Sequence, residues 1–135
     1  MVKNGLIHPD LLRELALCGH GDKVLIADGN YPLAQKSGDA AKIYLGLRLG
    51  TPSATEVLET LLTVVNVEKA EVMEPDDETV PPVFDEFSHC LKGMTLDTLS
   101  RQSFYHACAD AKVRVAIATG EQRVYANVLL TIGVA

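Results

Sequence analysis

The chain has 135 residues, which is typical of one domain, and its 47% hydrophobic and 22% charged residues exclude a wholly disordered protein. A formal net charge of −6 argues against nucleic acid or an anionic membrane as the main partner. No stretch approaches the ~20 apolar residues of a membrane span, and residues 1–10 lack a secretory signal, so we expect a cytoplasmic protein.

The N-terminal part of the chain predicts a short helix followed by a buried strand. Residues 8–19 carry apolar side chains at helical spacing, with Pro9 suited to the first turn and Gly19 to the C-terminal cap. Residues 23–28 form a short apolar run between turn residues, which indicates a buried strand. A loop rich in turn-forming residues follows at 28–32.

Helices and strands continue to alternate along the rest of the chain. Strands are expected at 43–47, 69–73, 113–118 and 125–132, helices at 51–65, 84–92 and 100–111, and a strand or turn at 94–99. Ser100 is suited to cap the last of these helices. The acidic loop at 74–78 is interpreted as solvated surface. The alternation predicts a layered α/β fold, and no domain boundary interrupts residues 1–135.

Polar residues lie at both ends of the first predicted strand. His20 precedes this strand and has the imidazole chemistry for proton transfer near neutral pH, although it could instead cap the preceding helix. Asp28 follows the strand and could accept hydrogen bonds from sugar hydroxyls or form an Asx turn. An extended strand would separate the two by ~20 Å, so a shared pocket requires a bent segment or a second subunit.

Two further pairs of polar residues lie near the C-terminus. Tyr125 and Asn127 are two apart in a predicted strand and would share a face, which suits hydroxyl binding but also fits a half-buried edge strand. Arg101 and Tyr105 share a helical face, either to contact a ligand or as an arginine–aromatic stack without function.

Metal and cofactor motifs are absent from the sequence. The cysteines are Cys18, Cys90 and Cys108, odd in number and without a Cys-x-x-Cys pair, so free thiols are expected. The histidines are His8, His20, His89 and His106, and their spacing is not that of metal ligands; His8 and His89 are interpreted as capping or surface residues. The glycines around His20 lack the spacing of a phosphate-binding loop.

Taken together, several short segments resemble the ribose pyranase and fucose mutarotase (RbsD/FucU) family of sugar mutarotases across most of the chain. In chain order these segments are His8-Pro9, Gly19-His20-Gly21-Asp22, Asp28-Gly29-Asn30-Tyr31-Pro32, Arg101 with Phe104-Tyr105, Thr119-Gly120-Glu121 and Tyr125-Ala126-Asn127. The resemblance implies a three-layer α/β/α domain with a mixed central sheet. It also implies a homo-oligomeric ring, often a decamer, with sites near subunit interfaces.

The same resemblance implies roles for individual residues. His20 corresponds to the catalytic histidine of the family, and the residues that would contact a monosaccharide substrate are Asp28, Arg101, Tyr125 and Asn127. No metal or cofactor is implied, because ring opening and closure require only proton transfer. The Gly-His-Gly-Asp turn and Arg101 favour the fucose branch over the ribose branch.

Three other functions remain open from the sequence. The same pocket would serve a non-catalytic sugar-binding or transport-accessory protein. Cys18 beside His20 would fit a thiol-dependent enzyme, although a helix C-terminus does not stabilise a thiolate. A metal-dependent lyase or isomerase would use His20, Asp22 and Asp28 together.

Overall fold

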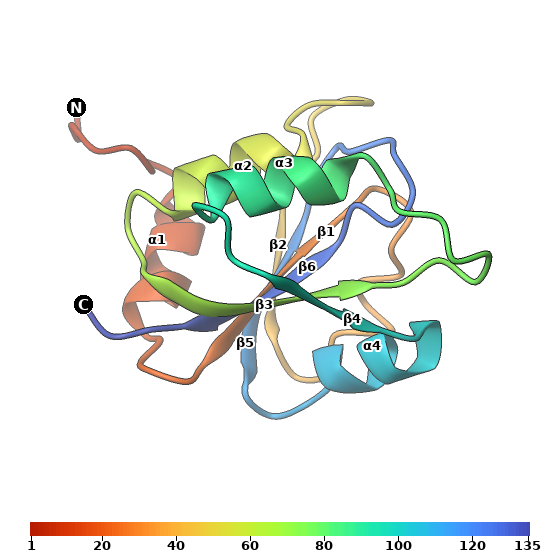
Figure 1. Cartoon of the computed structure of the whole chain (residues 1–135). Helices are drawn as coiled ribbons and strands as arrows, with labels where there is room; N and C mark the ends of the chain where they lie inside the picture. The colour runs from red at the N-terminus through yellow and green to blue at the C-terminus, as the bar shows by residue number, and fades with distance from the viewer.

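Four helices are interspersed among six strands in the computed structural model, which describes residues 1–135 (Figure 1). The helices are α1 (Pro9–Ala16), α2 (Ala54–Leu61), α3 (Val83–Cys90) and α4 (Arg101–Cys108). The strands are β1 (Lys23–Ala27), β2 (Ala41–Tyr44), β3 (Val67–Met73), β4 (Leu96–Leu99), β5 (Val113–Ala118) and β6 (Val128–Ile132). None of the helices has the length and apolar character that a membrane crossing requires. The alternation expected from the sequence is confirmed.

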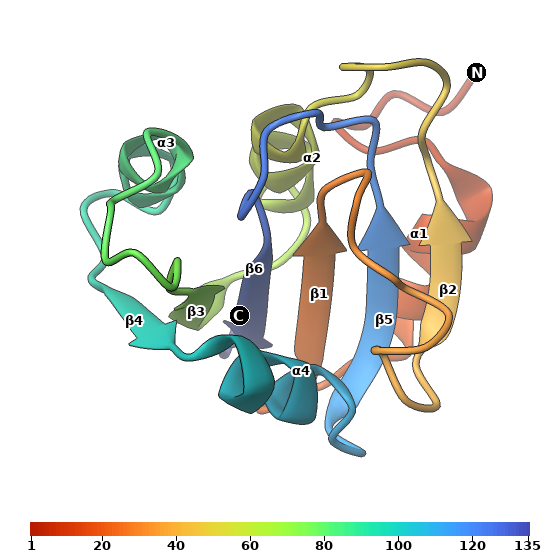
Figure 2. The ribbon, with the colours of Figure 1, turned by 90° about the vertical axis from the view of Figure 1, so that its right-hand side faces the viewer.

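All six strands form one mixed sheet in the order β2-β5-β1-β6-β3-β4. β2 and β1 pair with β5 in parallel, whereas β6 is antiparallel to both of its neighbours, β1 and β3. Figure 2 shows β6 running against β1 and β5. Because β6 opposes both neighbours, β1 and β3 run in the same direction and begin at the same edge of the sheet.

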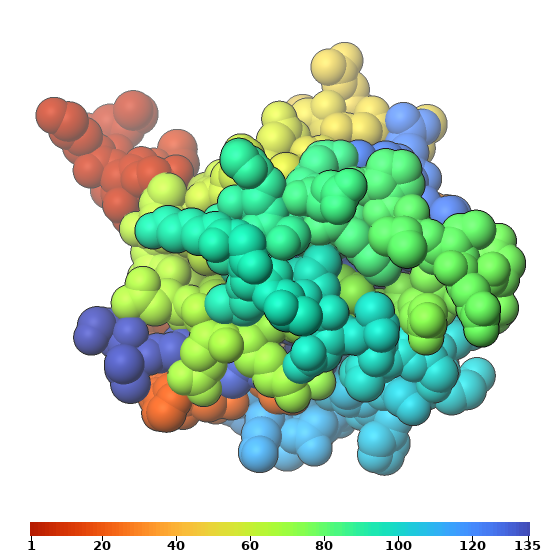
Figure 3. All heavy atoms as spheres, in the orientation of Figure 1, coloured from red at the N-terminus to blue at the C-terminus, as the bar shows by residue number.

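The loop between β3 and α3, residues 74–82, projects from the molecule on the side away from the chain termini (Figures 1 and 3). Its acidic residues Asp76, Asp77 and Glu78 are exposed, as expected for solvated surface. One of them, Asp76, also contacts Arg101. The loop therefore takes part in the surroundings of a predicted site residue.

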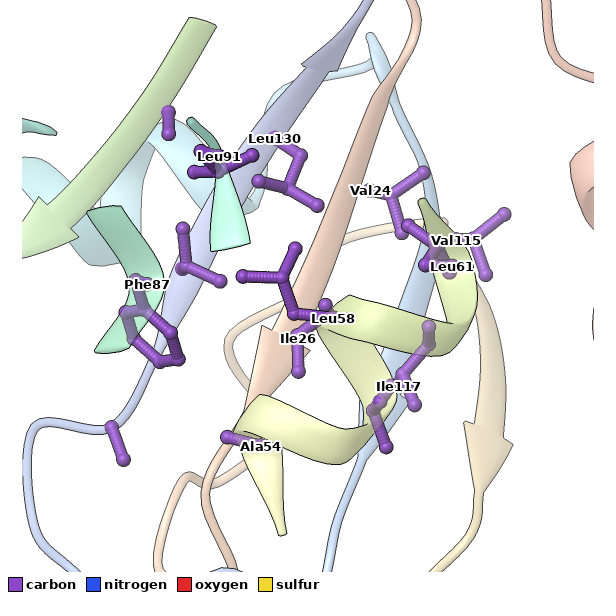
Figure 4. Close-up of a cluster of buried hydrophobic side chains, with 14 of the residues drawn as sticks. Val24, Ile26, Ala54, Leu58, Leu61, Phe87, Leu91, Val115, Ile117 and Leu130 are labelled. Carbon is purple, nitrogen blue, oxygen red and sulfur yellow. The ribbon is translucent and has the colours of Figure 1, made fainter. Parts of the chain in front are cut away.

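Helices cover both faces of the sheet, which confirms the three-layer architecture. Alternate residues of β1 point to opposite faces. Ile26 joins the larger core, where Leu58 of α2 and Phe87 of α3 pack over the sheet (Figure 4). Leu25 points to the other face and joins a smaller core with Phe104 of α4.

Side-chain caps mark where three of the helices begin. The imidazole of His8 accepts a hydrogen bond from the backbone N–H of Leu11 at the start of α1. Ser53 and Glu56 form a reciprocal capping box at the start of α2. Ser100 caps α4 with its hydroxyl, which confirms the expectation from the sequence.

Several expected boundaries are wrong. α1 ends at Ala16, so Gly19 does not cap it, and the other predicted helices also extend beyond their observed ends. β2 begins at Ala41, two residues before the predicted strand. The last strand begins at Val128 and excludes Tyr125, whose φ of 61° is a left-handed conformation outside the extended region of a regular strand.

Candidate functional site

A cavity of about 200 Å³ lies at the carboxyl end of β1. Its lining consists of Asp28, Asn30, Tyr31, Met73, Arg101, Tyr105, Val124, Tyr125 and Asn127. Four of the five predicted site residues therefore meet here, although they come from three distant parts of the chain. The volume is below the ~300–1,000 Å³ typical of pockets for drug-sized ligands, so the cavity suits a smaller molecule.

Asp28 and Asn127 form the buried polar floor of this cavity. The side-chain oxygen of Asn127 accepts a 2.8 Å hydrogen bond from the backbone N–H of Asp28. The Asp28 carboxylate accepts a 2.8 Å bond from the backbone N–H of Asn30, which confirms the Asx turn. Only 3% of Asp28 and 4% of Asn127 is exposed. Both side chains are thus held in one orientation by the backbone around them.

The buried position of Asp28 changes its acidity. Burial raises the pKa of the Asp28 carboxyl above its ordinary value, because the charged form loses hydration. Hydrogen bonds from the backbone of Asn30, Tyr31 and Ala126 and from the Asn127 amide lower the pKa, but by less. Asp28 is therefore a carboxylate that gains from an additional hydrogen-bond donor such as a ligand hydroxyl.

Arg101 and Tyr125 form the opposite, more accessible wall. Arg101, the first residue of α4, donates a 2.7 Å hydrogen bond from Nη2 to the phenol oxygen of Tyr125. The same nitrogen lies 3.3 Å from a carboxylate oxygen of Asp76. The sequence predicted that Tyr125 and Asn127 share the face of a strand. This is wrong, because both residues precede β6. The left-handed turn at Tyr125 nevertheless leaves both side chains in the cavity lining.

An aromatic wall completes the cavity. The rings of Tyr31 and Tyr105 are 5.5 Å apart between centroids, and the Tyr31 hydroxyl donates a 2.8 Å hydrogen bond to the backbone carbonyl of Lys36. Arg101 and Tyr105 both line the cavity, so they share a face of α4 as their spacing predicted. Tyr31 and Met73 were not predicted as lining residues. Tyr31 lies in the turn segment that contains Asp28, which was the available signal.

His20 lies outside the cavity, at the amino end of β1. Its Nε2 atom is 3.0 Å from Oε2 of Glu68, and 57% of its side chain is exposed. It does not cap α1, whose C-terminal cap is Leu17. Because β1 lies between His20 and Asp28, the separation expected from the sequence is confirmed. The lining of the cavity contains no histidine.

Two of the alternative sites do not fit the structure. Burial, reinforced by the Asp22 carboxylate, raises the pKa of the Cys18 thiol to about 11, so the thiolate of a thiol-dependent enzyme is disfavoured. Within one copy, β1 separates Asp28 from His20 and Asp22, so a single chain does not bring these three residues together as a metal centre. No group of three or more His, Cys, Asp or Glu side chains is arranged to hold a metal ion.

Comparison with known proteins gives a consistent set of relatives. A model of the RbsD / FucU transport protein family matches residues 1–135. D-ribose pyranase of Staphylococcus haemolyticus is 31% identical over 134 residues, which are 99% of this chain and 98% of that protein.

Solved structures agree with this result. Bacillus subtilis RbsD complexed with D-ribose has a TM-score of 0.86 and 30% identity, covering 100% of this chain and 99% of that one. The fucose mutarotase of Streptococcus pneumoniae in complex with L-fucose has a TM-score of 0.80 and 27% identity, covering 96% and 94%. The chain is therefore similar over 96% or more of its length to proteins named for each of the two sugars.

Proposed function

The chain belongs to the RbsD/FucU family, and we propose that it is a mutarotase that interconverts the anomers of a monosaccharide without a cofactor. One observation carries this proposal: Asp28, Arg101, Tyr125 and Asn127 converge on a cavity of about 200 Å³ with an aromatic wall. Carboxylate, guanidinium, phenol and amide groups together offer both acceptors and donors to sugar hydroxyls. The aromatic rings offer an apolar surface for the carbon-bound face of a sugar ring.

The chemistry needs only two proton transfers. One proton leaves the anomeric hydroxyl while another reaches the ring oxygen, so the bond between the anomeric carbon and the ring oxygen breaks and a free carbonyl forms. Rotation about the adjacent bond and the reverse transfers close the ring on the other face. In our proposal His20 moves the proton at the reacting centre, and Tyr125 or a water molecule serves the second transfer.

His20 can reach such a sugar only from another copy of the chain. We therefore propose a homo-oligomer, in the form of the decameric ring expected from the resemblance, in which His20 of one copy faces the cavity of the next. The exposure of His20 at the other end of β1 supports this arrangement. Exposed apolar side chains in and just after the edge strand β2 also support contact between copies: Tyr44, Leu47 and Leu49 are 64%, 82% and 81% exposed.

L-fucose or a related 6-deoxy sugar is the substrate we propose. Such a sugar carries a methyl group, which gains from contact with apolar groups such as Met73 and Val124 in the cavity lining. Arg101 supports the same choice, because an arginine at this position is similar to the fucose branch of the family. D-ribose is the second candidate, because the relatives matched by sequence include proteins named D-ribose pyranase at 31% and 33% identity.

Saturation-transfer NMR on L-fucose and on D-ribose tests the proposal with the wild type and His20→Ala. We expect the wild type alone to accelerate anomer exchange, and faster exchange of L-fucose than of D-ribose would support the fucose assignment. Full activity of His20→Ala would remove His20 from the mechanism. Binding of a sugar without faster exchange would favour the alternative function, a non-catalytic sugar-binding or transport-accessory protein.

A further inference from the structure

Glu68 contacts His20 through both of its carboxylate oxygens. Oε2 and Oε1 lie 3.0 Å and 3.1 Å from Nε2 of His20, and no other side chain bonds to this ring. An ionised carboxylate can only accept a hydrogen bond, so Nε2 carries the proton in this contact. In the neutral ring the lone pair is then on Nδ1.

The backbone around this pair is tied together at the edge of the sheet where β1 and β3 both begin. The N–H of Gly21 donates to the carbonyl of Ile132, and the N–H of Gly133 donates to the carbonyl of Asn66. These bonds, 2.9 Å and 2.8 Å long, link the turn before β1 and the start of β3 to the two sides of the end of β6. The segments that carry His20 and Glu68 are therefore both hydrogen-bonded to the end of β6, although the two residues are 48 positions apart in the sequence.

We propose that Glu68 is the positioning residue of His20: it orients the imidazole and keeps the proton on Nε2, so that Nδ1 exchanges the proton with the sugar. This inference rests on the proposed mutarotase function and on His20 as its proton-transfer group. A carboxylate that binds one ring nitrogen of a proton-transferring histidine acts in this way at other sites, because it sets both the tautomer and the ring orientation.

The contact between His20 and Glu68 contributes little to the stability of the fold. The two side chains are 57% and 46% exposed, and exposed ion pairs contribute little to the folded state. Glu68 is also absent from the lining of the sugar cavity. Its removal should therefore leave folding and ground-state sugar contacts within the cavity unchanged and act on the proton transfer.

A double-mutant cycle tests whether Glu68 acts through His20. We expect Glu68→Ala to lower kcat for anomer exchange by about 10–100-fold, by analogy with the carboxylate partners of metal-binding histidines, with KM changed by less than about twofold. In a His20→Ala background the same substitution should cause no further loss. Asp97→Asn is the matched control, because Asp97 is an exposed carboxylate on the neighbouring strand β4 that contacts Lys69 and no histidine.

Imidazole NMR of the full-length protein gives a readout that does not depend on activity. At mildly alkaline pH, two-bond ¹H–¹⁵N spectra of the wild type should show His20 with a hydrogen-bonded Nε2–H, and His20→Ala identifies its signals. Glu68→Ala should lose the hydrogen-bonded signal, and Glu68→Gln should lower the Nε2–H population, because an amide can also donate.

The outcomes separate this inference from the proposed function. Wild-type kcat in Glu68→Ala, or an equal loss in the His20→Ala background, would overturn the positioning role. A wild type that accelerates exchange of no tested sugar contradicts the mutarotase function instead. In that case an unchanged Nε2–H signal in Glu68→Ala would still overturn the inference, and its loss would support the control of the His20 tautomer by Glu68.

Discussion

The guanidinium of Arg101 donates a 2.7 Å hydrogen bond to the phenol oxygen of Tyr125 and lies 5.5 Å from the centre of that ring. The bond joins the first turn of α4 to the loop before β6, and Asp76 contacts the same nitrogen of Arg101. Since a guanidinium only donates, the phenol oxygen that accepts from it is left free to donate its own proton. In the proposed mechanism, this free O–H of Tyr125 would serve the second proton transfer to the sugar.

Tyr125→Phe removes this hydroxyl and keeps the ring. We expect kcat for anomer exchange to fall by about 10²-fold, the lower end of the range for a positioned acid or base, with a smaller change in KM. Exchange rates from saturation-transfer NMR check this, with Tyr44→Phe as the control, because Tyr44 lies on β2 outside the cavity and the substitution keeps the apolar ring that we place between copies. An unchanged rate in Tyr125→Phe would assign the second proton transfer to water.

We expect Asp28→Asn to have opposite effects on the stability of the fold and on sugar binding. The pKa of Asp28 is raised in the folded protein, chiefly by burial. Above the folded-state pKa the charged carboxylate therefore lowers the free energy of unfolding, and this penalty disappears as the pH falls through the folded-state pKa. We therefore expect Asp28→Asn to raise the free energy of unfolding at about pH 8 and to differ less from the wild type near pH 4.

The same substitution should weaken sugar binding, because an uncharged amide replaces the carboxylate acceptor. Urea unfolding at the two pH values measures the stability, and titration with the sugar measures the affinity. Lower stability of Asp28→Asn at the higher pH would show that the carboxylate is better satisfied than its burial indicates.

Mixed oligomers test whether the site is shared between copies. If His20 of one copy completes the cavity of the next, refolding His20→Ala with Tyr125→Phe in equal amounts should restore roughly a quarter of the wild-type sites. Asp28→Asn with Tyr125→Phe should restore none, because both residues line the cavity of the same copy. Activity assays on the co-refolded mixtures give the answer, and an inactive first mixture would contradict a site between copies.

Glu121 should make stability depend on pH in the acid range. Burial raises the pKa of this carboxyl, but hydrogen bonds from Arg123 and from the backbone N–H of Ala54 lower it by more, so the net shift is downward. Because the pKa is lower in the folded than in the unfolded state, the ionised carboxylate stabilises the fold at pH values above the unfolded-state pKa. This stabilisation is lost as the pH falls through the folded-state pKa. Glu121 is only 5% exposed, and its carboxylate accepts a hydrogen bond from the backbone N–H of Ala54 at the start of α2.

We expect Glu121→Gln to lower the free energy of unfolding at neutral pH by about 1–3 kcal/mol, since the buried contacts lose their charged acceptor. The difference from the wild type should shrink as pH falls below roughly 4, where the wild-type carboxyl is also protonated. Urea unfolding across this range is the measurement, with the exposed Glu59→Gln as control. A difference that is independent of pH would contradict the lowered pKa.

Local patterns predicted most of the secondary structure. β1, β3 and β5 lie at or near the expected ranges, and the capping role of Ser100 is confirmed, because hydrophobic periodicity and caps depend on residues a few positions apart. The ends of helices were less accurate. The start of the last strand was wrong because the left-handed conformation of Tyr125 is not encoded by its side chain alone.

The site residues were named from a resemblance, since their spacing alone left a functional and a structural interpretation open for each of them. By itself the sequence determined the α/β class and the placement of His20 and Asp28 at opposite ends of a strand. Only the tertiary structure decided that Asp28, Arg101 and Tyr125 share a cavity and that Glu68 meets His20. The physical reason is that strand order and loop closure depend on pairing between distant segments, and only that pairing brings residues from distant parts of the chain within hydrogen-bonding distance.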